Sequence, residues 1–370
     1  MRVVVGTGGT AGHVLPALAV AERLRDRLGA EVVFVGRDEG QEATLVPAAG
    51  FRLETVEAIP FSRRLSLATL RAPLAALRAA RQSRPVVRSA DVVLGMGGYV
   101  SVPVSLAARR ERVPLVLHEQ NALPGLANRL GARWAATVAL AFPETADRFP
   151  RRTRTVVTGN PVRASVVRVP EERDALADAA HDELGLEPGR QTVVVFGGSQ
   201  GALRLNRAAV ELGALLSGRQ DLQLLLLTGP RDHDEVVRRL PRPRQLIVRT
   251  VPFLERMELA YVVADLVVSR AGATTIAELA VCGLPAILVP YPYATGRHQE
   301  ANARALERAG GATVILDDAA TGESLAREIV SMLGDAGRLL SMARSAMRFG
   351  RPQAADAVAD VALAAAGARR

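Results

Sequence analysis

A strand, a glycine-rich loop and a helix follow one another twice in this chain, and this repeat constrains the fold most. The first copy runs from MRVVV through GTGGTAGH into VLPALAVAERLRDRLG, and the second from TVVVF through GGSQGA into LRLNRAAVELGALL. Short β-branched runs predict buried strands. Glycines allow close approach to a phosphate, and the helix N-terminus supplies free N–H groups for it. The repeat therefore predicts two Rossmann-like α/β domains, with parallel sheets facing across a cleft that holds a ligand.

Length and composition agree with two domains and limit the classes of partner that the chain could bind. The 370 residues exceed the usual size of one growing core, and 49% of them are hydrophobic but only 4% aromatic. The net charge is +9, carried entirely by arginine, which permits anionic partners. The absence of zinc-finger and RNP patterns, together with so few aromatics, argues against nucleic acid.

The cysteine count and the distribution of apolar residues set expectations for compartment and membrane contact. Cys282 is the only cysteine, so an internal disulfide is excluded, and its helical surroundings predict an inert buried thiol. The N-terminal MRVVVGTGG enters a strand directly, without the apolar segment of a secretory signal. No stretch of about 20 apolar residues lacks charges, so any membrane contact is expected to be peripheral.

The first glycine-rich loop carries a histidine with two readings. No GK[ST] follows, so the loop is not a P-loop, and it fits GxGxxG only loosely through Gly6, Gly8 and Ala11. The second predicted strand leads to Asp38 but to no convincing ribose acid, which weakens a dinucleotide reading. His13 stands at the helix start, where the helix dipole favours the neutral imidazole that a general base needs. A plain capping or packing role is the alternative.

Polar residues also follow strands farther along the chain. Glu119 and Asn121 come after the strand pattern PLVLH, in the block HEQN. In VVSRAGATTIAELAVCGLPAILVPYPYATGRHQEAN, Glu278 lies near a helix start, and Gln299 and Asn302 follow the next strand. The carboxyl ends of parallel strands are where open α/β sheets bind ligands. Thr275-Ile-Ala-Glu278 also fits a capping box, a structural role that competes for the same carboxylate.

Residues 60–84 form a basic, leucine-bearing segment without an acid. Its leucines are interleaved with arginines: Leu65, Leu67, Leu70, Leu74 and Leu77 with Arg63, Arg64, Arg71, Arg78, Arg81 and Arg84. Such a helix can lie on an anionic membrane surface. An ordinary amphipathic helix with a solvated arginine face is the alternative.

Seven blocks in one order resemble the MurG family of N-acetylglucosaminyltransferases: GGTAGH, GMGGYVS, HEQN, TGNPVR, GGSQGA, SRAGATTIAE and RHQEANA. The family transfers GlcNAc from UDP-GlcNAc to undecaprenyl-pyrophosphoryl-MurNAc-pentapeptide. The resemblance spans Val3 to about Leu316. It implies a GT-B fold, with an acceptor domain at 1–160 plus 342–370 and a donor domain at 161–341.

The resemblance also implies roles for matching positions. Glu278 would accept hydrogen bonds from ribose, Gln299 and Asn302 would hold sugar hydroxyls, and Leu254 would offer backbone groups to uracil. His13 is the first candidate for the general base and Glu119 the second. The full set of implied donor contacts is Thr10, Ala11, Gly12, Asn121, Arg163, Ser199, Gln200, Gly201, Leu254, Ala273, Thr274, Thr275, Glu278, Gln299 and Asn302.

An inverting transfer needs a base on one face and stabilisation of departing UDP on the other. No Asp-x-Asp motif is present at the predicted cleft, so helix-terminus amides and Arg163 are expected to stabilise the diphosphate without a cofactor or an obligatory metal. The family's lipid acceptor favours membrane contact, on the cytoplasmic face of the cell membrane. The expected membrane residues are Leu67, Leu70, Arg71, Leu74, Leu77 and Arg78.

Three other functions remain open at this point. A related GT-B transferase could use a soluble or natural-product acceptor, although HEQN and the basic segment favour the lipid. An NAD(P)-dependent oxidoreductase is disfavoured by the loose GxGxxG. A non-catalytic scaffold is disfavoured by intact His13, Glu278 and Gln299. Partners among cell-wall synthesis or division proteins are compatible with the resemblance.

Overall fold

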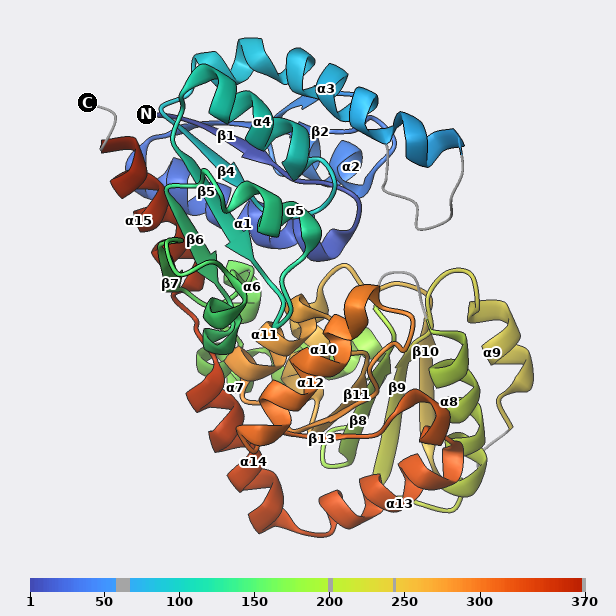
Figure 1. Ribbon diagram of the computed structural model, residues 1–370. Coiled ribbons are helices and arrows are strands. Elements are labelled where there is room, and N and C mark those ends of the chain that lie inside the picture. The colour runs from blue at the N-terminus through green and yellow to red at the C-terminus, as the bar shows by residue number, and fades with distance from the viewer. Residues whose placement is uncertain (58–66, 199–201, 242–243, 368–370) are drawn as a thin grey trace. The chain divides into compact units, whose positions relative to one another are not determined.

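The computed structural model describes residues 1–57, 67–198, 202–241 and 244–367, with side chains outside 58–73. The chain forms two compact units, Met1–Arg163 with Arg351–Arg370, and Ala164–Gly350. In both, helices cover the two faces of a parallel sheet (Figure 1). The predicted class of two Rossmann-like parallel-sheet domains is confirmed.

The first unit is built on a seven-stranded sheet in the order β3-β2-β1-β4-β5-β6-β7. Val3, Val4 and Val5 have no exposed surface, as expected for a central strand covered on both faces. The strands are β1 (Arg2–Gly6), β2 (Glu31–Gly36), β3 (Arg52–Thr55), β4 (Val92–Gly95), β5 (Leu115–Glu119), β6 (Thr137–Leu140) and β7 (Thr155–Val157). The helices are α1 (Ala11–Leu28), α2 (Gln41–Ala48), α3 (Leu67–Arg88), α4 (Ser101–Glu111), α5 (Leu126–Gly131), the 3-10 turn η1 (Pro143–Arg148) and α15 (Ala354–Gly367).

The second unit has a six-stranded parallel sheet in the order β10-β9-β8-β11-β12-β13. Its strands are β8 (Gln191–Phe196), β9 (Leu222–Leu227), β10 (Ile247–Val251), β11 (Leu266–Ser269), β12 (Ala286–Leu288) and β13 (Ala312–Val314). Its helices are α6 (Ala164–Val167), α7 (Val169–Leu184), α8 (Leu203–Leu215), α9 (His233–Arg239), α10 (Met257–Val263), α11 (Ala273–Cys282), α12 (His298–Arg308), α13 (Gly322–Leu333) and α14 (Ala336–Phe349), with 3-10 turns η2 (Thr295–Arg297) and η3 (Asp317–Ala319).

The last helix returns to the first unit. Along α15, Val358, Ala359 and Ala362 are fully buried in the core that also contains α1. Arg27 of α1 pairs with Asp356 at 3.2 Å and with Asp360. The boundary expected at 342 falls inside α14, which belongs to the second unit, and the chain joins the first unit from Arg351.

The strand orders place a topological switch point in each sheet. In the first, β1 lies between β2 and β4; in the second, β8 lies between β9 and β11. Loops that leave neighbouring strands in opposite directions open a crevice at the carboxyl ends of those strands. Both predicted glycine-rich loops follow the strand at such a point, since they come directly after β1 and β8.

Candidate active site

Two glycine-rich loops pack against each other at the switch point of the first unit. Gly98 has a φ of +76°, and a Cβ there would collide with the carbonyl oxygen of Gly8. Gly97 has a φ of +89°, and a Cβ there would lie 2.6 Å from Cδ2 of His13. The loop after β4 therefore needs glycine both for its backbone conformation and for its contact with the loop after β1.

His13 sits in the first turn of α1 and lines a small pocket. Its ring rests on Gly97, and its Nδ1 lies 3.1 Å from Oγ1 of Thr10, the residue before the helix. The pocket has a volume of about 50 Å³. Its walls come from the ends of α1, β4 and β5 and from α5: His13, Gly97, Gly98, His118, Glu119, Gln120, Asn121, Gly125, Ala127 and Asn128. The structure thus brings together His13, Glu119 and Asn121, which the sequence placed in two separate blocks.

Glu119 ends β5, and both of its carboxylate oxygens accept hydrogen bonds. Oε1 accepts from the backbone N–H of Asn121 at 3.0 Å and from its side-chain amide at 3.4 Å. Oε2 accepts from the N–H of Gly125 at 3.0 Å and from Nδ2 of Asn128 at 2.8 Å. The side chain is 2% exposed, and its burial raises the pKa of Glu119, while these hydrogen bonds oppose the rise. The carboxylate organises the loop that carries Asn121.

His118, the preceding residue, is fully buried and lines the same pocket as His13. Its Nε2 lies 3.0 Å from the carbonyl oxygen of Gly159, so Nε2 carries the proton and donates it. Burial lowers the pKa of His118 to about 4; the Gly159 bond acts against this, and the charge of nearby His13 adds to it. His118 is therefore neutral at physiological pH and contributes no charge to the pocket.

The remaining first-unit candidates lie near this loop or at the end of the unit. Thr10 is exposed, and Ala11 and Gly12 are half-buried in the first turn of α1. Arg163 is half-buried and is the last residue of the unit before α6.

In the second unit, Glu278 lies on α11 beside the switch point. It is 5% exposed, and its Oε2 accepts a 2.7 Å hydrogen bond from the hydroxyl of Tyr261 on α10. The capping-box interpretation is wrong. The helix begins at Ala273 with Gly272 as its N-cap, so Glu278 lies a turn and a half inside the helix, too far to reach the N-cap amide.

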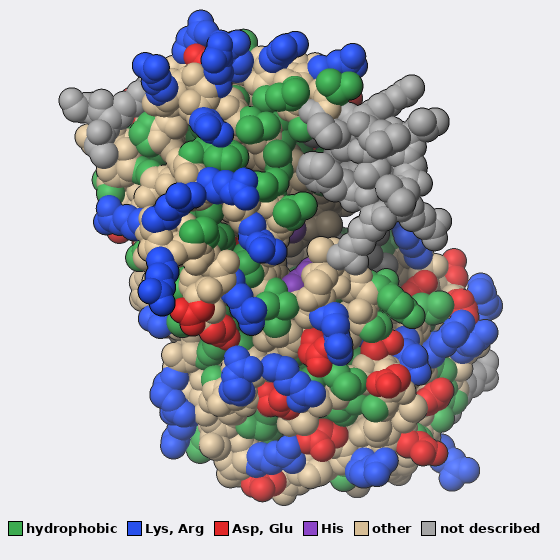
Figure 2. Space-filling view, in the orientation of Figure 1, with side chains coloured by type: hydrophobic (Ala, Val, Ile, Leu, Met, Phe, Trp, Pro, Cys, Tyr) green, Lys and Arg blue, Asp and Glu red, His purple; other side chains and the backbone are tan. Residues whose placement is uncertain are grey.

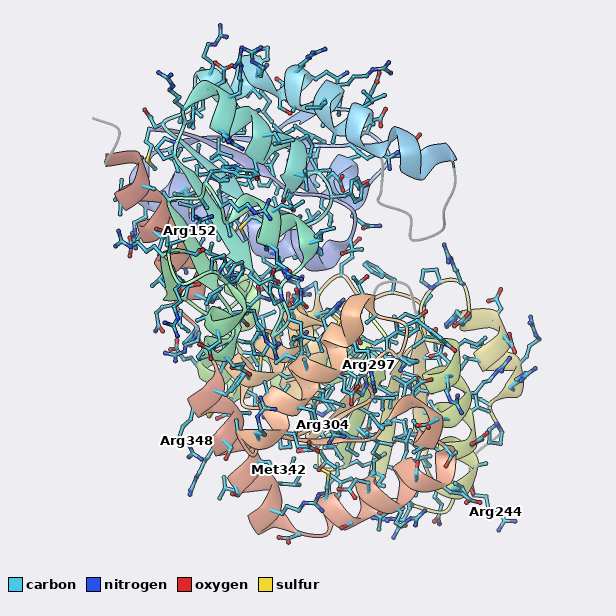
Figure 3. All side chains as sticks on the ribbon, viewed as in Figure 1. Arg152, Arg244, Arg297, Arg304, Met342 and Arg348 are labelled. Atoms are coloured by element: carbon cyan, nitrogen blue, oxygen red, sulfur yellow. The ribbon has the colours of Figure 1, made fainter. Side chains whose placement is uncertain are left out.

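Other donor-side candidates surround the same sheet edge. Gln299 is half-buried at the start of α12, and its Oε1 accepts from the N–H of Tyr291 at 2.9 Å. Asn302 is fully buried, and its Nδ2 donates to the carbonyl of Ala271 at 3.3 Å. Figure 3 labels Arg297 and Arg304, which bracket this part of the chain. Ala273 is buried, whereas Thr274, Thr275 and Leu254 are half-buried; Leu254 follows β10. Ser199, Gln200 and Gly201 lie outside the described residues.

Residues 67–84 of the basic segment lie in helix α3, as their periodicity predicts, and residues 60–66 lie outside the described residues. Leu74 and Leu77 are 62% and 52% exposed, while Ala79, Ala80 and Ser83 face the interior. Arg84 and Arg88 pair with Glu111 of α4, whereas Arg78 and Arg81 make no ion pair with any described residue. In Figure 2, arginine side chains gather where Figure 1 places α3. The side chains of Leu67, Leu70 and Arg71 lie outside the described residues.

Two residues of these sites were missed by the sequence analysis. Glu42 on α2 is fully buried under the first glycine-rich loop, and Tyr261 holds Glu278. Neither belongs to a recognisable motif. The spacing of Tyr261 within YVVADLVVS shows an apolar helix-to-strand segment but no partner.

No three His, Cys, Asp or Glu side chains of the described residues are grouped so that they could hold a metal ion. Among the described helices, none combines the length and apolar character needed to span a bilayer.

Comparison with known proteins finds one family over nearly the whole chain. Residues 3–140 match the N-terminal domain, and residues 192–358 the C-terminal domain, of glycosyltransferase family 28. A UDP-N-acetylglucosamine--N-acetylmuramyl-(pentapeptide) pyrophosphoryl-undecaprenol N-acetylglucosamine transferase of Halothermothrix orenii is 43% identical over 363 residues, covering 96% of each chain. The protein of the same description from Moorella thermoacetica is 41% identical and covers 98% of each.

A solved structure agrees with the sequence comparison. The crystal structure of MurG from Acinetobacter baumannii superposes with a TM-score of 0.77 at 30% identity, covering 98% of this chain and 99% of that one. Both domains of the chain thus have counterparts in one solved transferase of the GT-B class.

Proposed function

The chain belongs to glycosyltransferase family 28, and we propose that it transfers GlcNAc from UDP-GlcNAc to the MurNAc 4-hydroxyl of undecaprenyl-pyrophosphoryl-MurNAc-pentapeptide. The observation that carries this proposal is the 43% identity, over 96% of both chains, to a transferase named for that donor and acceptor. The reaction converts lipid I to lipid II in peptidoglycan synthesis. It inverts the α-linkage of the donor, so the acceptor hydroxyl attacks opposite the departing UDP.

His13 is the proposed general base. In the tautomer that this role requires, Nδ1–H would donate to Thr10 Oγ1, 3.1 Å away, and Nε2 would take the proton of the attacking hydroxyl. Contact with Gly97 fixes the plane of the ring. Glu119 was the second candidate for this role, but four hydrogen bonds already use both of its oxygens. Glu119 is better suited to hold Asn121 and the pocket wall than to accept a substrate proton.

The donor is proposed to bind at the switch point of the second unit. Glu278, oriented by Tyr261, would accept the ribose hydroxyls. Gln299 would donate from Nε2 to the sugar, because its Oε1 is engaged by Tyr291. Asn302 would support the loop at Ala271 from inside, and Leu254 would meet uracil with its backbone. The helix-terminus amides after β8 and β11, with Arg163, would stabilise the diphosphate without an obligatory metal.

We also propose that α3 docks the enzyme on the anionic inner leaflet of the cell membrane, where the lipid acceptor lies. Leu74 and Leu77 expose apolar surface beside Arg78 and Arg81, whose charges are not neutralised by described acids. Apolar insertion together with basic attraction is the combination that holds peripheral helices on anionic lipid.

The test is a transfer assay with UDP-GlcNAc and a lipid I analogue, in which release of UDP and formation of the disaccharide product are both followed. Wild-type protein should be active with EDTA present, and His13→Ala should lose at least about 100-fold in kcat, the lower range for a general base. Turnover of a soluble sugar acceptor in preference to the lipid would favour the alternative transferase. Absence of UDP release with every acceptor would refute the proposal.

A further inference from the structure

A buried carboxylate lies beneath the first glycine-rich loop and belongs to neither the proposed base nor the proposed donor contacts. Glu42 occupies the first turn of α2 and has no exposed surface. Its Oε2 accepts the N–H of Gly9 at 3.0 Å, and its Oε1 accepts the N–H of Arg37 at 3.1 Å. One side chain thereby joins the loop after β1 to the loop after β2. The positive end of the α2 dipole favours a negative charge at this position.

Three glycines make room for this carboxyl group. A Cβ at Gly36 would lie 2.6 Å from Cγ of Glu42, and a Cβ at Gly8 or Gly40 would collide with its carboxylate oxygens. None of the three has a positive φ, so backbone conformation does not explain why glycine stands there. The space that their missing side chains leave is filled by Glu42.

The held loop leads directly to the proposed base. Gly9 precedes Thr10, which contacts Nδ1 of His13. The carbonyl of Gly8 packs on Gly98, and Gly97 packs on the His13 ring. The guanidinium of Arg37 also donates to the hydroxyl of Tyr99 at 3.2 Å. This bond links the loop after β2 to the loop after β4, which contains Gly97 and Gly98. Displacing Glu42 would therefore release the loops after β1 and β4, which hold His13 in place.

We infer that Glu42 is a positioning residue for the transfer reaction. Its carboxylate occupies the anion-binding position at the Gly9 amide of the first glycine-rich loop, called here the anion seat, and thereby holds His13 against Gly97. The inference rests on the proposed function. It also revises the interpretation of that loop as a phosphate cradle, because the Gly9 amide already binds an anion supplied by the protein. The Gly9 amide is therefore not available to a substrate diphosphate, which would have to use other N–H groups.

The experiment compares Glu42→Ala with Glu39→Ala, a matched control in the neighbouring loop whose exposed carboxylate pairs with Arg37. Glu42→Ala should lose about 30-fold or more in kcat, since misplacing a reacting group by about 1 Å costs on the order of 100-fold. The Kd for UDP should stay within about 2-fold, because its proposed contacts lie mainly on the second unit. Glu39→Ala should keep wild-type kcat.

Chemical rescue separates positioning from general stability. The alanine variant lacks one CH₂ and the carboxylate, which acetate replaces, so acetate should restore kcat at least about 10-fold, to a level that chloride at equal ionic strength does not reach. Full activity in Glu42→Gln or Glu42→Ala, or a loss that acetate does not restore, would overturn the inference. If wild-type protein shows no transfer, the proposed function fails instead. The anion seat is then tested by whether acetate raises the melting temperature of Glu42→Ala; no rise would overturn it.

Discussion

The buried His118 should make the first unit lose stability in mild acid. Burial lowers its pKa to about 4, whereas an unfolded histidine titrates near 6.5. Between those values the unfolded chain binds more protons than the folded one, so the free energy of unfolding falls as the pH drops through this window. Within this window, each pH unit lowers the free energy of unfolding by up to about 1.36 kcal/mol. By about pH 5 the loss attributable to His118 is therefore about 2 kcal/mol.

The variant His118→Gln isolates this contribution. Glutamine keeps an N–H donor for the carbonyl of Gly159 but does not titrate. Glu119 acts with the opposite sign, because burial raises its pKa and the folded state then holds the extra proton. That contribution is present in both proteins and cancels in the comparison. The pH dependence of wild type should exceed that of His118→Gln by about 2 kcal/mol between about pH 7.5 and pH 5.

Trp134 makes the measurement specific to the first unit. It is the only tryptophan in the chain, it packs against a first-unit core cluster, and its Nε1 donates to the carbonyl of Ser105 at 3.1 Å. Denaturant unfolding followed by tryptophan fluorescence therefore reports on this unit. His181→Gln, in the second unit, is the control and should match wild type. Equal pH dependence in wild type and His118→Gln would refute the assigned protonation state.

Three further predictions concern the proposed sites. Gly97→Ala should lower kcat about 10-fold or more, because the added methyl group would displace the His13 ring. Gly50 also has a positive φ, +77°, but open space around it, so Gly50→Ala should lower only stability. Equal kcat losses in the two variants would contradict the argument from the Gly97–His13 contact. Glu278→Gln should raise the KM for UDP-GlcNAc about 10-fold or more, as expected for a lost charged hydrogen bond, and an unchanged KM would remove Glu278 from the ribose site. Arg78→Glu with Arg81→Glu should abolish salt-sensitive binding to anionic vesicles, while Arg231→Glu with Arg238→Glu, the same charge change on exposed second-unit arginines, should not.

The sequence predicted the elements that local patterns encode. Runs such as RVVVG and TVVVF are β-branched, and the glycines after them mark the loops, so both parallel sheets and both switch-point loops follow from short stretches. His13, Glu119 and Asn121 could be named for the same reason. Their convergence on one pocket depends on strand order, because β1 and β5 are separated by β4 in the sheet.

What the sequence could not reveal are contacts between distant positions. Glu42 stands in the ordinary helical segment QEATLVPA, 33 residues from the Gly9 amide that it binds, and no spacing rule connects them. Glu278 was open to a capping-box reading because the start of α11 was uncertain by a few residues. A helix that begins at Ala273 instead of after Thr275 changes that side chain from a cap into a partner of Tyr261.

The return of α15 to the first unit has a consequence for synthesis on the ribosome. The second unit is one uninterrupted segment, Ala164–Gly350, and can close as soon as that segment has emerged. The first unit begins earlier but needs Val358, Ala359 and Ala362 to complete the core around α1. The half of the enzyme translated first is therefore finished last, and a chain that stops before α15 leaves an apolar face uncovered in the unit that carries His13.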